Sequence, residues 1–287
     1  LKSQASGVLV VDGTPTTISL SAGQKGIYAF DGVAGQTLGV ALSGYSASPS
    51  GTGGNVTMSV VSPQGVTLAT CGSYYSGAGG CSWNNYPNVL PSTGSYQIVV
   101  QADGSHASTA TLTLSTHPSG TLVADAAPAI VAVSRLGQAP RYTFTGTAGQ
   151  SLSLAWSGST LATGTGYIYV YRPDGTQLTF AQADGAVPNG SLLLNGLTQT
   201  GPYTVVVWPA GNASTTGQIA LQLLSAASGS LIVDGTPTTI SLNAGQLGRY
   251  TFDAVAGQMV GLAVSNYSSS PSGGLVSISV VSPQGVT

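Results

Sequence analysis

This chain contains unusually few charged residues. Only 5% of its 287 residues are charged, glutamate is absent, and the formal net charge is −2. An ordinary soluble domain carries about 25% charged residues. Because nucleic acid and anionic membranes are bound through clustered Lys and Arg, the composition predicts neither a nucleic-acid partner nor binding to a membrane surface.

Long apolar runs are missing as well. No stretch approaches the roughly 20 consecutive apolar residues of a membrane-spanning helix, so we expect no membrane insertion. Apolar residues nevertheless make up 42% of the chain, which is enough to build cores and distinguishes it from a disordered polar linker. A neutral surface rich in Gly, Ser and Thr lacks the solubility that charge confers and favours self-association.

Cysteine is nearly absent, since the chain has only Cys71 and Cys81, on either side of a Gly-rich loop. A pair that closes a short loop in a chain without other thiols is typical of a disulfide, and therefore of an oxidising compartment. Two free thiols are the alternative. A zinc site needs about four ligands and no His lies nearby, so we expect no metal and no cofactor. The predicted location is extracellular or at the cell surface.

Three stretches of the chain are copies of one another. Residues 11–20 return almost unchanged as residues 233–242. Asp12, Asp125 and Asp234 mark the same point in the three copies and are 113 and 109 residues apart, which is the size of a small domain. The chain is therefore a tandem array.

The outer two copies agree more closely with each other than with the middle one, which predicts a duplicated two-unit cassette, A-B-A-B. The first residues align with the end of the middle copy, so we expect a window on a longer array. We expect the third copy to be completed by further residues of its own chain. The predicted domains are the tail of a preceding repeat (1–7), repeat A (8–120), repeat B (121–229) and an incomplete repeat A (230–287).

Apolar residues recur with period two or in short β-branched runs, and Gly and Pro supply turns between them. No long stretch shows helical periodicity with caps. The pattern predicts an all-β fold of tandem antiparallel β-sandwiches, jelly-roll-like, with seven or eight strands in a unit. In the first copy seven strands are predicted at residues 16–20, 27–30, 37–42, 56–61, 66–70, 96–100 and 110–114.

The same motifs follow one another in each complete copy. In the first copy, Tyr-x-Phe at Tyr28 precedes a Gly-containing turn, the alternating strand 38–42, Pro-Gln-Gly, and Gly-Ser-Tyr at residues 94–96. This order resembles the bacterial pre-peptidase C-terminal domain family. The resemblance implies a secreted jelly-roll-like sandwich that accompanies extracellular enzymes or decorates surface proteins as a binding or spacer module. It implies no catalytic residues.

Residues that commonly carry chemistry are sparse. His106 and His117 are the only imidazoles, and no Gly-x-Ser-x-Gly motif precedes a helix. We therefore expect no enzyme, although a Ser-His-Asp triad is defined by geometry rather than sequence order. Calcium needs several oxygen ligands close together, whereas the aspartates occur singly, so we predict that they cap turns. The aspartates are Asp12, Asp31, Asp103, Asp125, Asp174, Asp184, Asp234 and Asp253.

Aromatic residues are more informative. Tyr74, Tyr75, Trp83 and Tyr86 cluster in a loop rich in Gly and Asn. If exposed, they form a platform for a sugar ring or a neighbouring subunit, because large rigid rings bury much area at low entropic cost. If packed, they cover the end of the sandwich, and the sequence leaves both interpretations open.

Two other patterns indicate less. Trp156 and Trp208 lie in strand-like runs, where packing in the core or on a sheet face is the prediction. Four glycosylation sequons occur, but the triplet is frequent by chance in a chain rich in Ser and Thr. The sequons begin at Asn55, Asn189, Asn212 and Asn266.

These features predict an extracellular structural protein whose β-sandwich repeats form a bacterial surface fibre, sheath or stalk. Uncharged strand edges lack the usual protection against edge-to-edge pairing, so self-association into a fibre or array is the expected interaction. The alternative is an adhesin or the accessory binding module of a secreted hydrolase, which recognises a glycan or matrix protein through residues 71–86.

Overall fold

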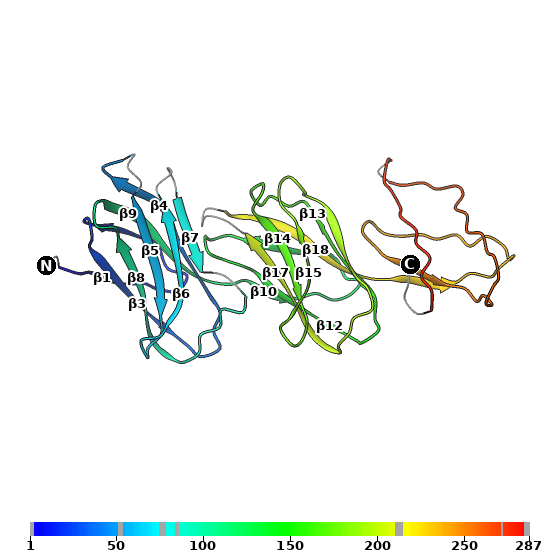
Figure 1. Ribbon diagram of the computed structural model, residues 1–287, viewed down its shortest axis with the longest axis horizontal. Helices are drawn as coiled ribbons and strands as arrows, with labels where there is room; N and C mark the ends of the chain where they lie inside the picture. The colour runs from blue at the N-terminus through cyan, green and yellow to red at the C-terminus, as the bar shows by residue number, and fades with distance from the viewer. Residues whose placement is uncertain are drawn as a thin grey trace. The chain divides into compact units, whose positions relative to one another are not determined.

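Every regular element that the structure describes is a β-strand, which confirms the predicted all-β class. The structure is a computed structural model that describes residues 3–50, 54–74, 79–83, 86–209, 215–270 and 272–283, without the side chains of residues 73, 74 and 79–81. In this part of the chain no helix is long and apolar enough to cross a membrane. Two β-sandwiches, each made of two packed sheets, contain strands β1 to β18 (Figure 1).

The first sandwich packs a five-stranded sheet, in the order β1-β3-β8-β5-β6, on a four-stranded sheet, in the order β2-β9-β4-β7. The last two strands in sequence, β8 and β9, are therefore interior strands of the two sheets. The strands are β1 (Ala5–Val8), β2 (Thr16–Leu20), β3 (Lys25–Gly32), β4 (Leu38–Ser48), β5 (Asn55–Val61), β6 (Thr67–Tyr74), β7 (Gly79–Trp83), β8 (Gly94–Ala102) and β9 (Ala107–Thr116).

Alternating apolar side chains fill the space between the two sheets of the first sandwich. Phe30 of β3 stacks on Tyr96 of β8, with ring centroids 5.3 Å apart. The hydroxyl of Tyr96 donates a hydrogen bond to the carbonyl oxygen of Ser92 at 2.6 Å, because a buried phenol needs a partner. This cross-strand pair ties β3 to β8 inside the core.

The second sandwich repeats this plan, with sheet orders β10-β12-β17-β14-β15 and β11-β18-β13-β16. Phe144 stacks on Tyr203 at 5.2 Å, and the hydroxyl of Tyr203 donates to the carbonyl oxygen of Gln199 at 2.9 Å. The strands are β10 (Ser119–Thr121), β11 (Ala129–Val133), β12 (Arg141–Gly146), β13 (Leu152–Ser157), β14 (Gly166–Tyr171), β15 (Gln177–Gln182), β16 (Gly190–Leu194), β17 (Gly201–Pro209) and β18 (Gly217–Ser225).

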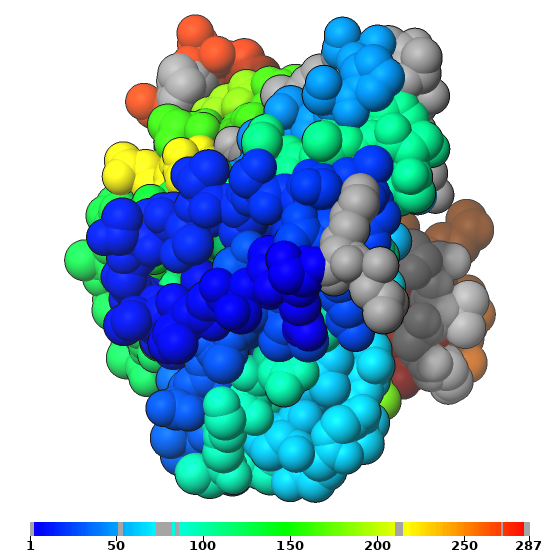
Figure 2. Space-filling model, turned by 90° about the vertical axis from the view of Figure 1, so that its left-hand side faces the viewer, coloured from blue at the N-terminus to red at the C-terminus, as the bar shows by residue number. Residues whose placement is uncertain are grey.

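A short connecting strand opens each sandwich and pairs in parallel with the strand of the Tyr-x-Phe motif. β1 pairs with β3, and β10 pairs with β12. In Figure 2 the N-terminal residues, in dark blue, lie on the surface of the first sandwich. β1 and β10 overlap the predicted boundaries at residues 7 and 120, because backbone pairing assigns both strands to the sandwich that follows.

The third copy has little regular structure. β19 (Ala227–Ser230) and β20 (Gly248–Thr251) form a two-stranded sheet, and no strand follows β20 among the described residues. The chain divides into one unit of residues 1–228 and 240–249 and a second unit of residues 229–239 and 250–287. In the second unit Leu262 and Ile278 are 53% and 54% exposed, whereas the matching Val40 and Met58 of the first sandwich are fully buried.

Candidate functional site: a repeated joint

Among the described residues six Gly-Gln pairs form turns, and each turn holds its glutamine side chain in the same way. The Oε1 atom accepts a hydrogen bond from the backbone N–H of the residue three positions earlier, at 2.8 to 3.2 Å. The preceding glycine adopts a positive φ of 69 to 84°, a conformation that glycine reaches without steric cost. The glutamines are Gln24, Gln36, Gln138, Gln150, Gln246 and Gln258.

Three of these glutamines also reach a residue that precedes their own copy. Their Nε2 atom donates to a backbone carbonyl oxygen at 2.7 to 3.0 Å. The acceptors of the second and third pair are the last residues of β9 and β18, and the first acceptor occupies the matching place before β1. One contact therefore recurs where each copy begins. The pairs are Gln24 with Ser3, Gln138 with Thr116, and Gln246 with Ser225.

Two of these acceptor residues, Thr116 and Ser225, are also bound by an aspartate of their own sandwich. Asp12 and Asp125 adopt positive φ values of 58 and 63°, which Asp tolerates better than most residues. Oδ1 of Asp12 accepts from the backbone N–H of Thr116, and Oδ1 of Asp125 from that of Ser225, both at 2.9 Å. Hydrogen bonds from the backbone and then from the side chain of Ser225 lower the pKa of Asp125. The final residue of each sandwich is therefore fixed by its own aspartate and by a glutamine of the next copy.

Glycine lets the backbones of the first two sandwiches meet directly. A Cβ atom at Gly39 of β4 would lie 1.9 Å from the carbonyl oxygen of Gly137, so no side chain fits there. A Cβ at Gly137 would lie 3.1 Å from the Cβ of Ala41, and a Cβ at Gly245 would lie 3.1 Å from the Cβ of Ala155. Because Ala41 and Ala155 are matching residues of β4 and β13, the Gly-Gln turn packs on the same strand in both joints.

Two of the chain's few cationic side chains lie in the first joint. Nη2 of Arg135 donates to the carbonyl oxygen of Gly13 at 2.6 Å. Arg141 donates to the carbonyl oxygen of Pro87 at 2.8 Å, and its guanidinium lies 5.3 Å from the ring centroid of Tyr86. Burial lowers the pKa of Arg141 to about 10, so it stays charged at neutral pH and adds a cation–π contact to the joint.

His117 lies inside the first joint and has a structural role. It is buried, and its Nδ1 accepts a hydrogen bond from the backbone N–H of Ala139 at 3.0 Å. Burial, and then the charge of Arg141, lower the pKa of His117 to about 3, so the ring is neutral at physiological pH. At the next joint the matching N–H of Leu247 donates to Oγ of Ser153 at 2.9 Å. A histidine and a serine thus accept the same backbone hydrogen bond.

His106 lies at the other end of β9, in the turn that precedes it. Its Nδ1 is 2.9 Å from Oδ1 of Asp103, which also accepts from the backbone N–H groups of Ser105 and His106 at 2.8 Å each. The hydrogen bond with His106, followed by those from the backbone, lowers the pKa of Asp103. Asp103 therefore caps this turn.

Other aspartates also cap turns, as the sequence predicts. Asp174 accepts from the backbone N–H of Thr176 at 2.8 Å, and Asp184 from that of Ala186 at 2.9 Å. The described residues contain no group of three or more His, Cys, Asp or Glu side chains that could hold a metal ion. The carboxylates of these turns are used in local hydrogen bonds.

The predicted disulfide and aromatic loop are described only in part. Cys71 is on β6 and Cys81 on β7, which are edge strands of the two opposed sheets. The side chain of Cys81 lies outside the described residues, so the bridge stays a prediction, as does a ligand contact by Tyr74 and Tyr75, whose side chains are also outside them.

The two remaining rings of that loop are packed. Trp83 is only 7% exposed and belongs to the core of the first sandwich. Tyr86 stacks on Tyr171 of the second sandwich, with ring centroids 4.1 Å apart. Trp83 is therefore a core residue, and Tyr86 is in contact with the second sandwich.

Sequence reasoning missed a larger aromatic cluster, on the second sandwich. The prediction for tryptophan is confirmed, since Trp156 is buried in the core and Trp208 packs on a sheet face against Tyr167 and Tyr169. The signal that could have found the cluster is the alternation Tyr-Ile-Tyr-Val-Tyr at residues 167–171.

No protein-family model and no curated protein matches this chain. Among solved structures it is similar to the pre-peptidase C-terminal domain of collagenase from Bacillus anthracis, at 12% identity and a TM-score of 0.29, over 37% of this chain and 95% of that one. It is also similar to PliG, a periplasmic inhibitor of g-type lysozyme from Aeromonas hydrophila, at 18% identity and a TM-score of 0.28, over 38% and 99% of the two chains. Similarities at this level carry no argument about function.

Proposed function

We propose that this chain is part of an extracellular structural protein, in which β-sandwich repeats form a bacterial surface fibre, sheath or stalk. The observation that supports the proposal is the repeated joint. The same glutamine-to-carbonyl contact recurs where each of the three copies begins, and the same aspartate contact recurs at the ends of β9 and β18. In a repeat protein each unit contacts only its neighbours. When the same contact joins successive units, those units are therefore regularly spaced along the array.

The joint also differs from a flexible tether. Linkers rich in Gly and Ser behave as random coils when nothing holds them. Here the linking residues pair in parallel with β12, the N–H of Arg141 donates to the carbonyl oxygen of Pro118 at 2.8 Å, and His117 is buried. A linker that only separates two domains does not require this strand pairing, hydrogen bonding and burial.

Electron microscopy of source-purified material, kept under non-reducing conditions, tests the proposal. We expect uniform fibres or sheaths whose axial repeat equals the length of one or two sandwiches. Separate flexible beads on a string would contradict the structural function and favour an adhesin or an enzyme-accessory array.

The binding alternative loses part of its support. Trp83 is buried, so Trp83→Ala would disturb the core rather than a ligand contact. Tyr86 contributes to the first joint through Arg141 and Tyr171. A double Tyr74→Ala, Tyr75→Ala variant is the remaining test of that loop, and unchanged binding to glycan arrays and matrix proteins would exclude it.

A further inference from the structure

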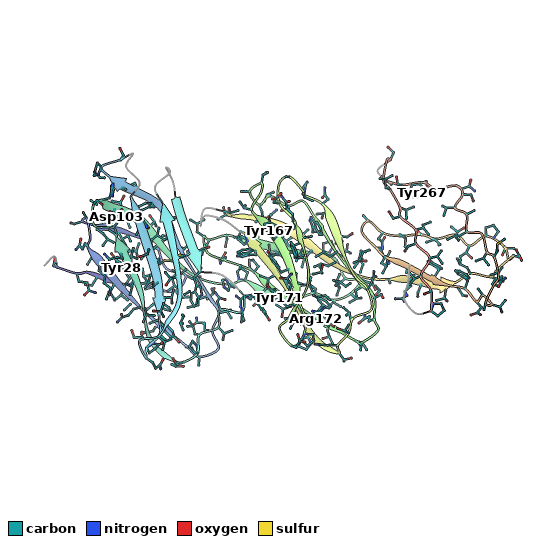
Figure 3. The ribbon with its side chains drawn as sticks, viewed as in Figure 1. Tyr28, Asp103, Tyr167, Tyr171, Arg172 and Tyr267 are labelled. Carbon is teal, nitrogen blue, oxygen red and sulfur yellow. The ribbon has the colours of Figure 1, made fainter. Side chains whose placement is uncertain are left out.

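One face of the second sandwich carries aromatic rings that its core does not use. Every second residue of β14 is tyrosine, and Ile168 and Val170 between them are fully buried, so the tyrosines point away from the core. Their cross-strand neighbours on β15 and β17 add two more rings. Figure 3 labels two of the tyrosines on β14. We call the five side chains the aromatic face: Tyr167, Tyr169, Tyr171, Phe180 and Trp208.

The rings of the aromatic face form one continuous surface. Tyr169 is central, with ring centroids 5.4 Å from Phe180, 5.6 Å from Trp208 and 6.3 Å from Tyr171. Tyr167 lies 6.2 Å from Tyr169. Phe180, on the edge strand β15, is 53% exposed and is the most open ring. The three tyrosines lie along one strand, so the aromatic surface is elongated in the direction of β14.

The fold itself does not need these rings. At the matching positions of the first sandwich, β5, β6 and β8 carry Thr, Ser, Val, Thr and Gln. Oγ of Ser59 and Oγ1 of Thr70 are 2.9 Å apart there, where Tyr169 and Phe180 stack in the second sandwich. The matching residues are Thr57, Ser59, Val61, Thr70 and Gln101. The same sheet is thus built without aromatic side chains at these positions in one sandwich and with aromatic side chains in the other.

The polar atoms of the aromatic face are hydrogen-bond donors. The hydroxyls of Tyr167, Tyr169 and Tyr171 make no hydrogen bond to any residue that the structure describes. Burial raises the pKa of Tyr169 and of Tyr171, so these phenols are protonated at neutral pH. Gln182 on β15 and Thr204 on β17 are polar neighbours across the strands.

Charge is nearly absent from the aromatic face. No Asp occurs in β12, β14, β15 or β17. Arg141, opposite Val206 at one side, is already bonded to the backbone of Pro87. Arg172, which follows β14, is bonded to the carbonyl oxygen of Gln177 at 2.6 Å. The face is therefore neutral, aromatic and rich in hydroxyl donors.

We propose that the aromatic face binds a neutral polysaccharide. A pyranose ring presents C–H groups on its face and hydroxyls around its edge, which match aromatic rings flanked by phenol, amide and threonine side chains. The long row of tyrosines along β14 suits a linear chain of such rings. This site meets the loop of residues 71–86 where Tyr86 stacks on Tyr171, and it does not depend on whether the chain forms fibres.

A second copy of the chain fits the aromatic face less well. Aromatic side chains are also enriched in the cores of protein interfaces, but Val206, the aliphatic residue opposite Tyr169, is 2% exposed and so offers a second copy almost no aliphatic surface. Tyr171 is already covered by Tyr86 at 4.1 Å, so the exposed surface begins at the joint and extends away from it. A polyhydroxylated partner can also form hydrogen bonds with the phenol hydroxyls of Tyr167 and Tyr169, which an apolar partner would leave without hydrogen bonds.

Affinity gel electrophoresis with glucomannan and xyloglucan, together with pull-down on insoluble cellulose and chitin, tests this proposal. The main variant, Tyr167→Thr, Tyr169→Ser, Phe180→Thr, Trp208→Gln, copies the first sandwich and is therefore compatible with the fold. We expect the unaltered chain to be retained by at least one of these polysaccharides and the fourfold variant not to be. Tyr169→Ser alone should weaken binding about tenfold, as expected for a central aromatic contact. Tyr267→Ser, which removes an exposed tyrosine elsewhere, is the matched control and should bind normally.

Circular dichroism and urea unfolding establish that each variant is folded, and the single variants Tyr169→Ser and Phe180→Thr carry the test if the fourfold variant is not. Absence of retention of the unaltered chain on all four polysaccharides would overturn the proposal, as would equal retention of the variants. Binding to alginate or heparin alone, abolished by Arg172→Gln, would overturn it in favour of an anionic ligand. A dimer in sedimentation that the fourfold variant dissociates, without polysaccharide retention, would identify a second copy as the occupant.

Discussion

His117 makes the first joint sensitive to acid. Its pKa is about 3 in the folded chain and about 6.5 in an unfolded one, so below pH 6.5 the unfolded chain binds more protons. Folding stability therefore falls as the pH drops from 6.5 towards 3, by up to about 1.4 kcal/mol for each pH unit. Protonation would also remove the acceptor for the N–H of Ala139 and place a second positive charge near Arg141. Urea unfolding of the chain between pH 7 and pH 4.5 measures this loss.

The control for this prediction is His117→Asn, because an amide oxygen can accept the bond from Ala139 and does not titrate. Its unfolding free energy should change much less over the same range of pH. The carboxylates with lowered pKa values begin to lose their contribution only near pH 4, and His106 is present in both proteins. An identical pH dependence of the two proteins would show that His117 does not control the joint.

At the scale of strands, periodicity located most elements. The seven predicted strands of the first copy correspond to β2, β3, β4, β5, β6, β8 and β9. β1 was missed because its Ala-Ser-Gly sequence has no apolar alternation and its pairing with β3 depends on backbone contact alone. β7 was missed because it begins with two glycines. The strand predicted at residues 37–42 ended before Ser48, the end of β4, because the register shift after Ser43 interrupts the apolar alternation.

The joint could not be predicted from the sequence in the same way. The turns of Gln24 and Gln36 share the letters Ala-Gly-Gln, and both glutamines accept the same local hydrogen bond. Only the tertiary structure brings Gln24, and not Gln36, beside a carbonyl oxygen of an earlier segment. The aromatic face, by contrast, is visible as tyrosine at every second residue of β14, a pattern typical of one face of a strand.

The difference between the two kinds of Gly-Gln turn gives a matched experiment. In Gln138→Glu the carboxylate still accepts from the N–H of Arg135, but it cannot donate to the carbonyl oxygen of Thr116. A hydrogen bond contributes about 0.5–1.5 kcal/mol, so we expect the amides of Ala139 and Arg141 to exchange with solvent up to about tenfold faster. Hydrogen exchange followed by mass spectrometry of peptides over residues 117–143 measures this change.

Gln150→Glu is the control, because it introduces the same charge into a turn whose glutamine makes no contact with an earlier copy among the described residues. It should leave the exchange of the joint unchanged. If both variants accelerate exchange equally, added charge rather than the lost hydrogen bond is the cause, and the glutamine contact does not hold the joint.

At the scale of the whole chain, the third copy matches the first in sequence but not in burial. In the first sandwich β8 separates β3 from β5, and β9 separates β2 from β4. In the described residues of the third copy, β20, the counterpart of part of β3, pairs with β19 alone, and no strand follows it. Apolar side chains there are exposed, with Met259 at 97% and Leu275 at 98%.

Limited digestion with chymotrypsin should therefore cut the chain in a fixed order. Proteases act on segments that open easily, so we expect the first cuts after Met259, Tyr267 or Leu275, whose counterparts in the first sandwich lie in or beside its strands. The two sandwiches should survive as one fragment that contains both, because their joint is held by backbone pairing and by Gln138. Mass spectrometry of the products identifies the cuts. Early separation of the two sandwiches near residues 115–120 would contradict a rigid joint, and with it the physical basis for a regularly spaced array.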